Sequence, residues 1–189
     1  MKKNALLLFV FAALGFGAIS CASPYDPAPQ ILPEHIRKVF IRPVINNTNQ
    51  FGIETKLTLA INDEILRDGR LSIVNTEAEA NGIITAEIRR YILQPLTYDA
   101  NMITEQYKLW VIVNVSFIDR ENNVTLWTEP NMEGIQIYLD KTNSGGAGGS
   151  MSEEEAREMV WEKLSRDIVK RTIRGFGSVT SVSERKVPN

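Results

Sequence analysis

The chain has 189 residues, of which 43% are hydrophobic and 23% charged, and its formal net charge at pH 7 is −2. That length suits one domain with its own hydrophobic core once an N-terminal leader is set aside. The mildly acidic balance and the lack of a long basic run exclude a nucleic-acid-binding protein, because such proteins need a positive surface to meet the phosphate backbone.

The N-terminus has the layout of an export signal. Lys2 and Lys3 precede an uncharged run at 5–19, which is shorter than the roughly 20 residues that a membrane-spanning helix needs. The segment Ala18-Ile19-Ser20-Cys21 resembles a lipobox, in which the cysteine is acylated and becomes the new N-terminus. We therefore expect residues 1–20 to be a lipoprotein signal peptide and Cys21 to be lipidated, with acyl chains such as palmitate.

The alternative is an ordinary signal peptide that leaves Cys21 as an incidental thiol. Cys21 is the only cysteine in the chain, and a single cysteine in an exported protein needs another explanation because oxidising compartments favour paired cysteines. Neither Ala22 nor Ser23 is the aspartate that typically retains a lipoprotein in the inner membrane. We therefore expect a periplasm-facing domain that is lipid-anchored in the outer membrane.

Past Cys21, the pattern predicts a proline-rich tether at 21–36, an α+β domain at 37–175 and a flexible tail at 176–189. Strands are expected at 37–44, 71–74, 83–93, 107–118 and 124–139, the last of them irregular near Pro130. A first helix at 53–67 should end at Asp68-Gly69, and a second should begin at a capping box, Ser152 with Glu155, and run to Ile173 or Arg174. We expect a loop at 95–104 and a floppy glycine-rich linker at 142–150, where no phosphate-binding signature is present.

Alternation along two of the strands predicts a sheet with one buried and one open face. In 83–93 the buried set is expected to be Ile84, Ala86, Ile88 and Ile92, and the open set Thr85, Glu87, Arg89 and Tyr91. In 107–118 the buried set is Leu109, Val111, Val113, Val115 and Phe117, while Lys108, Trp110 and Ile112 belong to the open face. The element order predicts a two-layer α+β sandwich, whose mixed, mostly antiparallel sheet has about four to five strands and carries both helices on one face.

Residues suited to catalysis or metal binding are sparse. The single histidine, His35, lies in the tether and is expected to be a surface residue. The acidic run Glu153, Glu154 and Glu155 falls in a predicted first helical turn, where capping and solvation are the ordinary roles of carboxylates. The sequence therefore predicts a protein that is not an enzyme and has no metal or cofactor; a lipid-anchored hydrolase with an unrecognised site is the competing possibility.

At several places the chain resembles the lipopolysaccharide-assembly lipoprotein family, LptE. The resemblance lies in residues 40–48 (FIRPVINNT), 68–74 (DGRLSIV), 79–84 (EANGII), 105–109 (EQYKL) and 125–127 (TLW), which occur in the family's order after a lipobox and tether. It implies an outer-membrane lipoprotein that plugs and helps to assemble the β-barrel LptD and takes part in lipopolysaccharide transport to the outer leaflet. The alternative is an accessory lipoprotein of another envelope machine, either a cell-wall synthase activator or a secretion-pore assembly factor.

The family is thought to bind lipopolysaccharide through basic side chains, because lipid phosphates favour Arg and Lys donors. No motif maps such residues onto this chain. Arg89 and Lys108 are candidates because both are expected on the open face of neighbouring strands. The alternative is that they are ordinary solvated charges of the sheet surface.

Overall fold

A computed structural model gives the fold of residues 32–142 and 150–174. The predicted signal peptide, the lipidation site Cys21, most of the tether, the glycine-rich stretch and the predicted tail lie outside these described residues. In the described ranges no helix is long and apolar enough to cross a membrane.

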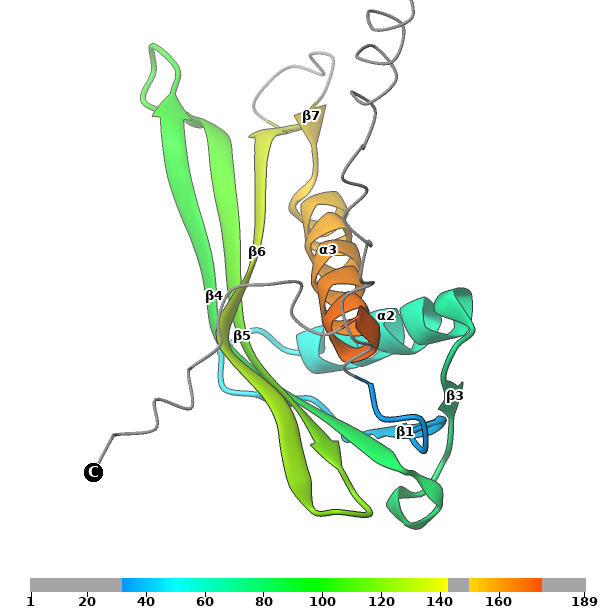
Figure 1. Cartoon of the computed structure of the whole chain (residues 1–189). Coiled ribbons are helices and arrows are strands. Elements are labelled where there is room, and N and C mark those ends of the chain that lie inside the picture. The colour runs from blue at the N-terminus through cyan, green and yellow to red at the C-terminus, as the bar shows by residue number, and fades with distance from the viewer. Residues whose placement is uncertain (1–31, 143–149, 175–189) are drawn as a thin grey trace, which may run out of the picture.

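The described chain folds into one curled sheet with helices packed against it (Figure 1). Its elements are β1 (Lys38–Ile41), β2 (Ile45–Asn46), α2 (Ile53–Asp68), β3 (Ser72–Ile73), the 3-10 turn η1 (Glu77–Glu79), β4 (Gly82–Tyr98), β5 (Thr104–Asp119), β6 (Val124–Asp140), β7 (Ser150–Met151) and α3 (Glu153–Arg174). The strand order is β3-β1-β4-β5-β6-β7, and β2 also pairs with β4. The long strands β4, β5 and β6 are antiparallel to one another, whereas β1, β2, β3 and β7 make parallel pairs at the margins.

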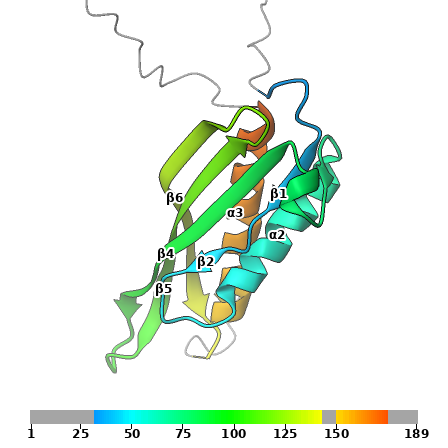
Figure 2. The same cartoon turned by 90° about the horizontal axis from the view of Figure 1, so that it is seen from below.

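The α+β class and the position of both helices on one side of the sheet agree with the sequence (Figure 2). The predicted sheet of four to five strands is wrong, because the sheet has seven strands and curls instead of forming a regular sandwich layer. The predicted first strand at 37–44 is shorter in the structure, where β1 ends at Ile41, and β2 lies past its predicted end; the two pair with successive parts of β4 on either side of Pro43, which has no N–H to donate. The two-residue strand β7 was not predicted; it pairs with the end of β6.

The hairpin formed by β4 and β5 is longer than the sequence predicts. The expected loop at 95–104 is wrong, because β4 continues through Pro95 to Tyr98 and β5 begins at Thr104. In the described residues this part of β4 pairs with β5 alone. Its other edge has no strand partner, so a proline, which has no N–H to donate, is tolerated there. The predicted irregularity near Pro130 is confirmed, since the register of β6 against β5 shifts there and Asn131 has a φ of 61°.

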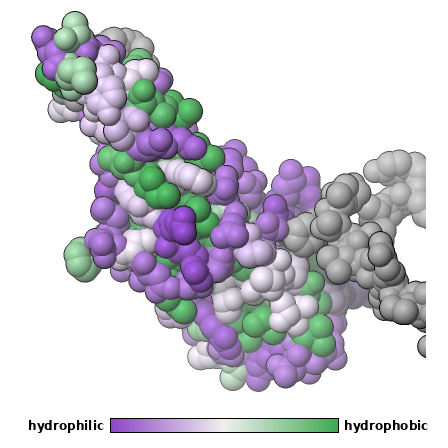
Figure 3. All heavy atoms as spheres, turned by 90° about the vertical axis from the view of Figure 1, so that its left-hand side faces the viewer, coloured by the Kyte–Doolittle hydropathy of each residue, from purple (hydrophilic) through white to green (hydrophobic). Residues whose placement is uncertain are grey.

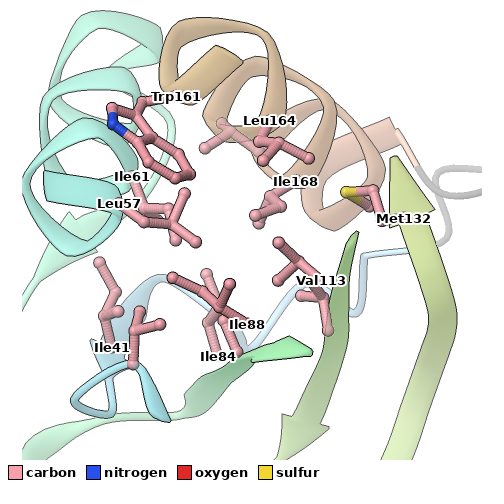
Figure 4. Close-up of a cluster of buried hydrophobic side chains, with 14 of the residues drawn as sticks. Ile41, Leu57, Ile61, Ile84, Ile88, Val113, Met132, Trp161, Leu164 and Ile168 are labelled. Atoms are coloured by element: carbon pink, nitrogen blue, oxygen red, sulfur yellow. The ribbon is translucent and has the colours of Figure 1, made fainter. Parts of the chain in front are cut away.

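The core lies between the helices and the concave side of the sheet (Figure 4). From α2 it receives Ile53, Leu57, Ile61 and Ile65, and from α3 it receives a stripe that includes Ala156, Val160, Leu164 and Ile168. The predicted end of α2 and the predicted start of α3 are confirmed. Gly69 stops α2 in the left-handed conformation and donates its N–H to the carbonyl of Ile65, and the capping box forms at the start of α3.

Gly134 lets α3 lie directly on the backbone of β6. A Cβ atom built at this position would lie 2.6 Å from a methyl group of Val160 and 2.9 Å from Leu164. No side chain larger than hydrogen fits without moving the helix, so the third long strand and the C-terminal helix form one tightly packed unit.

The chain enters the domain at the end of β5 that is farthest from the β4–β5 turn. His35 is paired there with Asp119, with 2.9 Å between Nε2 and Oδ2. Asp119 is buried and also accepts hydrogen bonds from the side chain of Asn122 and from the backbone amides of Glu121 and Asn122. Burial would raise the pKa of the Asp119 carboxyl, but the hydrogen bonds from Asn122 and His35 outweigh it and hold that pKa below its ordinary value of 3.8.

Replacement Asp119→Asn should therefore destabilise the fold in a pH-dependent way. A depressed carboxylate pKa contributes stability that is complete above the ordinary pKa and is lost as the pH falls through the lower pKa of the folded state. We expect the variant to have a free energy of unfolding about 1–3 kcal/mol below that of the parent at pH 7, and the difference to shrink below about pH 4. Urea unfolding of both proteins at neutral and acidic pH measures this, and a difference that stays constant with pH would contradict it.

Candidate functional site: the open face of the sheet

The side of the sheet that faces away from the helices carries the candidate site (Figure 3). A β-bulge in β4 determines which side chains lie on this side. Ile88 pairs with Val113, and Arg90 pairs with the neighbouring residue Ile112, so Arg89 is an extra residue in β4. Beyond a single inserted residue the side chains of a strand exchange faces. The sequence prediction for β4 is therefore correct before Arg89 and reversed after it.

Tyr91 lies on the helix side and not on the open face as the alternation predicted. Its hydroxyl donates to Glu153 at 2.5 Å and accepts from Nε of Arg157 at 2.6 Å, and both partners belong to the first turns of α3. Burial and the bond to Glu153 raise the pKa of the Tyr91 phenol, so it remains a neutral donor. The network fixes the start of α3 to β4 just past the bulge.

Ile92 was predicted to be buried but lies on the open face, opposite Trp110. Trp110 is in turn opposite Ile135 of β6, and Ile112, one row below, is buried although it faces away from the helices. These residues make an apolar patch, which we call the Trp110 patch: Ile92, Trp110, Ile112 and Ile135. It is more apolar than an ordinary solvated sheet face.

Two contacts of the Trp110 side chain are relevant to binding. Lys108, two residues away on the same face, places its ammonium group 4.5 Å from the centre of the indole ring, in a cation–π contact. The indole Nε1–H is buried and has no hydrogen-bond partner among the described residues. A buried donor without a partner is costly, and a bound partner that supplied an acceptor would relieve that cost.

Arg89 and Lys108, the two predicted basic residues, are both on the open side but are not neighbours. Lys108 lies opposite Gln94, which is five residues farther along β4 than Arg89 and hence roughly 17 Å away along the strand. Arg89 instead lies 3.7 Å from the carboxylate of Glu87 and lines a hollow of about 340 Å³ together with Arg90, Ile92 and the polar loop at 47–50. The sequence analysis missed Arg90 as part of this group, because only the bulge brings it beside Arg89 on the accessible surface.

The other predicted features have structural roles. Glu155 caps α3, Glu153 belongs to the Tyr91 network and Glu154 is 3.4 Å from Lys56 of α2. No group of three or more potential metal ligands occurs in residues 32–142 and 150–174. Another hollow of about 290 Å³ lies around Asn114 and Ser116, and apolar side chains such as Ile45 and Pro130 line it together with polar ones. Within the described part of the chain, the acidic residues therefore have structural roles, and the open face of the sheet is the candidate binding surface.

Comparison with known proteins places this domain in a family. The family model for LptE, described as lipopolysaccharide-assembly, matches residues 36–172, and the chain belongs to that family. The suspected family membership is thereby confirmed. No curated protein matches the chain in sequence.

Solved structures are similar to this chain at low sequence identity. Protein XCC0632 from Xanthomonas campestris is 9% identical with a TM-score of 0.51, over 77% of this chain and 88% of that one. The uncharacterized lipoprotein B from Nitrosomonas europaea is 18% identical with a TM-score of 0.42, over 78% and 86% of the two chains. A minor lipoprotein from Acinetobacter baumannii is 13% identical with a TM-score of 0.45, over 72% and 91%. At 9% identity the similarity to protein XCC0632 concerns the fold alone.

Proposed function

We propose that this protein is a lipid-anchored, outer-membrane lipoprotein that plugs and helps to assemble an LptD-type β-barrel and takes part in moving lipopolysaccharide to the outer leaflet. The observation that carries the proposal is a family match over the whole described domain, joined to a sheet whose second face is left open. An accessory protein that enters a barrel needs a surface for the barrel wall and no catalytic centre of its own.

The Trp110 patch is the part of the open face that we assign to the barrel. Its centre is apolar, and charged and polar residues surround it: Arg90, Gln94, Lys108 and Glu133. An apolar centre within a polar rim, with a tryptophan in the middle, is the arrangement in which a few residues supply most of the binding energy of a protein interface.

Replacement Trp110→Glu should weaken the complex with the barrel. Loss of a central tryptophan typically costs at least about 2 kcal/mol of binding, or roughly 30-fold in affinity. We expect much less LptD-type barrel to co-purify with the tagged variant from detergent-solubilised membranes than with the parent. Leu66→Glu, which puts the same charge on the exposed side of α2, is the matched control and should retain the barrel. Recovery of a cell-wall synthase or a secretion-pore ring in place of the barrel would contradict the proposal.

The basic residues of the same side are assigned to lipopolysaccharide. Arg89 is exposed and lies next to Arg90 in the hollow beside loop 47–50, and Lys108 rests on the indole of Trp110. Phosphate groups favour arginine donors with neutral hydrogen-bonding neighbours, and Asn47, Thr48, Asn49 and Gln50 provide such neighbours.

Combined replacement Arg89→Glu and Lys108→Glu should lower the affinity for lipopolysaccharide. Removal of two charge-assisted contacts predicts a loss of at least about tenfold. The matched control is Arg166→Glu with Lys170→Glu, the same change of charge on exposed positions of α3. Binding of lipopolysaccharide to the purified proteins measures the effect. Equal affinity of both double variants would remove Arg89 and Lys108 from the site.

The outer-membrane address rests on Cys21. A small-residue lipobox before a single cysteine supports lipidation, and two or more acyl chains hold a protein at a membrane stably. The proline-rich segment that follows is long enough to hold the domain next to a barrel in the same membrane.

Replacement Cys21→Ser should block lipidation and leave unprocessed precursor in the inner membrane. The measurement is fractionation of inner and outer membranes followed by mass determination of the chain, with Ser20→Ala, which keeps a small residue in the lipobox, as the control. Full recovery of the Cys21→Ser protein in the outer membrane would contradict the proposed lipid anchor. It would leave the proposed role of the open face unaffected.

A further inference from the structure

The turn between β5 and β6 carries an exposed asparagine in the pattern of a glycosylation acceptor. Residues 121–125 are Glu-Asn-Asn-Val-Thr, so Asn123 is followed two positions later by Thr125, with Val124 between them. Enzymes that attach oligosaccharides to asparagine recognise Asn-x-Ser/Thr, where x is not proline, on the surface of exported proteins. The transferases of bacterial periplasms recognise a longer pattern, with Asp or Glu two residues before the asparagine, and Glu121 supplies that residue.

The geometry of the turn presents this pattern to solvent. Residues 120–125 are all exposed, and they lie at the opposite end of the long strands from the β4–β5 turn (Figure 1). Asn123 has a φ of 53°, a left-handed conformation that asparagine adopts more readily than most residues and that places it at the bend. Asp119 holds the bend by accepting hydrogen bonds from the backbone amides of Glu121 and Asn122. The acceptor pattern therefore lies on a well-defined projection of the domain.

The chain contains two further Asn-x-Ser/Thr triplets, and the fold uses the polar groups of both. One of them lies within β5, where the side-chain amide of Asn114 donates to Glu87 at 3.4 Å. In the same triplet the hydroxyl of Ser116 lies 3.1 Å from the hydroxyl of Thr128. A transferase has to bind the amide and the hydroxyl together, so this triplet is a poor acceptor once the sheet has formed.

The second further triplet is closed in the same way. The side-chain amide of Asn46 donates to the carbonyl of Gln50 at 2.6 Å, and the hydroxyl of Thr48 donates to the side-chain oxygen of Asn46 at 2.8 Å. At the β5–β6 turn the situation is different. Within residues 32–142 and 150–174, neither the side-chain amide of Asn123 nor the hydroxyl of Thr125 has a hydrogen-bond partner, so both groups are available to an enzyme.

The acidic residue also distinguishes this turn from the other two triplets. Their corresponding positions hold Val44 and Ile112, which carry no charge. Asn81 donates a hydrogen bond to one carboxylate oxygen of Glu121, and the Glu121 side chain remains exposed. A carboxylate held in this way suits a cationic side chain of an enzyme, because charge-assisted hydrogen bonds are the stronger ones.

We propose that Asn123 is an acceptor for N-linked glycosylation in the periplasm, with an oligosaccharide on a polyprenyl diphosphate as the donor. The side-chain amide nitrogen attacks C1 of the first sugar, the bond from C1 to the diphosphate oxygen breaks, and polyprenyl diphosphate leaves. One amide proton passes to a carboxylate base of the transferase, so nothing is oxidised or reduced. The inference rests on the proposed export of the chain.

The position of the turn is compatible with the proposed function. His35, where the chain enters the described domain, pairs with Asp119 at the base of the same turn. A domain inside a barrel has to leave this end open to the incoming chain, so a glycan on Asn123 has room there. Trp110 is nine residues from Asp119 along β5, roughly 30 Å away, so the glycan leaves the Trp110 patch uncovered.

The test uses the whole protein, purified from the outer membranes of the cells that naturally make it. Trypsin cuts after Lys and Arg except before Pro, and this places the three triplets on separate peptides, 39–56, 109–120 and 121–141. Mass spectrometry of the peptides locates an oligosaccharide, and the mass of the intact chain also shows whether Cys21 is acylated. We expect the oligosaccharide on peptide 121–141 alone.

Substitutions in the exposed turn examine each part of the pattern. Asn123→Gln and Thr125→Val should abolish the modification, and Glu121→Gln should lower its occupancy at least about tenfold, because one charge-assisted contact with the transferase is lost. Val124→Thr is the matched control, since it changes an exposed residue of the same turn, keeps the pattern and should keep the glycan.

An unmodified peptide 121–141 in the parent protein overturns the inference, and so does a glycan that persists in Asn123→Gln or Thr125→Val. A chain that is acylated at Cys21 but carries no glycan overturns this inference alone and leaves the proposed function intact. A chain with neither modification contradicts the proposed anchor as well.

Discussion

The extra residue that Arg89 adds to β4 is the constraint on which the binding surface depends. Because side chains alternate along a strand, one inserted residue exchanges the two faces for the remainder of β4. Tyr91 is turned towards α3 and bonds to Glu153 and Arg157, while Ile92 is turned outwards next to Trp110. The same insertion thus attaches the C-terminal helix to the sheet and completes the apolar patch on the other side.

The two helices pack against the opposite side of the sheet from that surface. Among the described residues two helices cover one side of the sheet, and Val160 and Leu164 of α3 pack so closely on Gly134 of β6 that a Cβ atom there would overlap them. No described helix covers the second side, and its part around Trp110 carries apolar side chains where a solvated face would carry polar ones. The ammonium group of Lys108 lies over the indole ring of Trp110 in this part of the face.

The two ends of the long strands carry different kinds of side chains. At one end His35 and Asp119 tie the incoming chain to the turn between β5 and β6 through charge and hydrogen bonds. At the other end the turn between β4 and β5 presents apolar side chains on a self-bonded backbone. The open face lies between them, so the attachment of the chain and the proposed contact with a partner use separate parts of one fold.

The sequence by itself determined the class of fold, the two helices with the end of α2 and the start of α3, the buried set of β5 and the membership of a family. These depend on local periodicity, capping residues and the order of motifs. The early end of β1 at Ile41, the short strand β7 and the extension of β4 through Pro95 depend on which edges are paired, and only the tertiary structure decided that. The same holds for the composition of the open face. Regular alternation placed Tyr91 there, and no feature of residues 88–90 marks a bulge, because an insertion in one strand is defined only by the register of its neighbour. Arg89 and Lys108 were correctly placed on the open side but not as neighbours, since the distance between residues of different strands is set by that register.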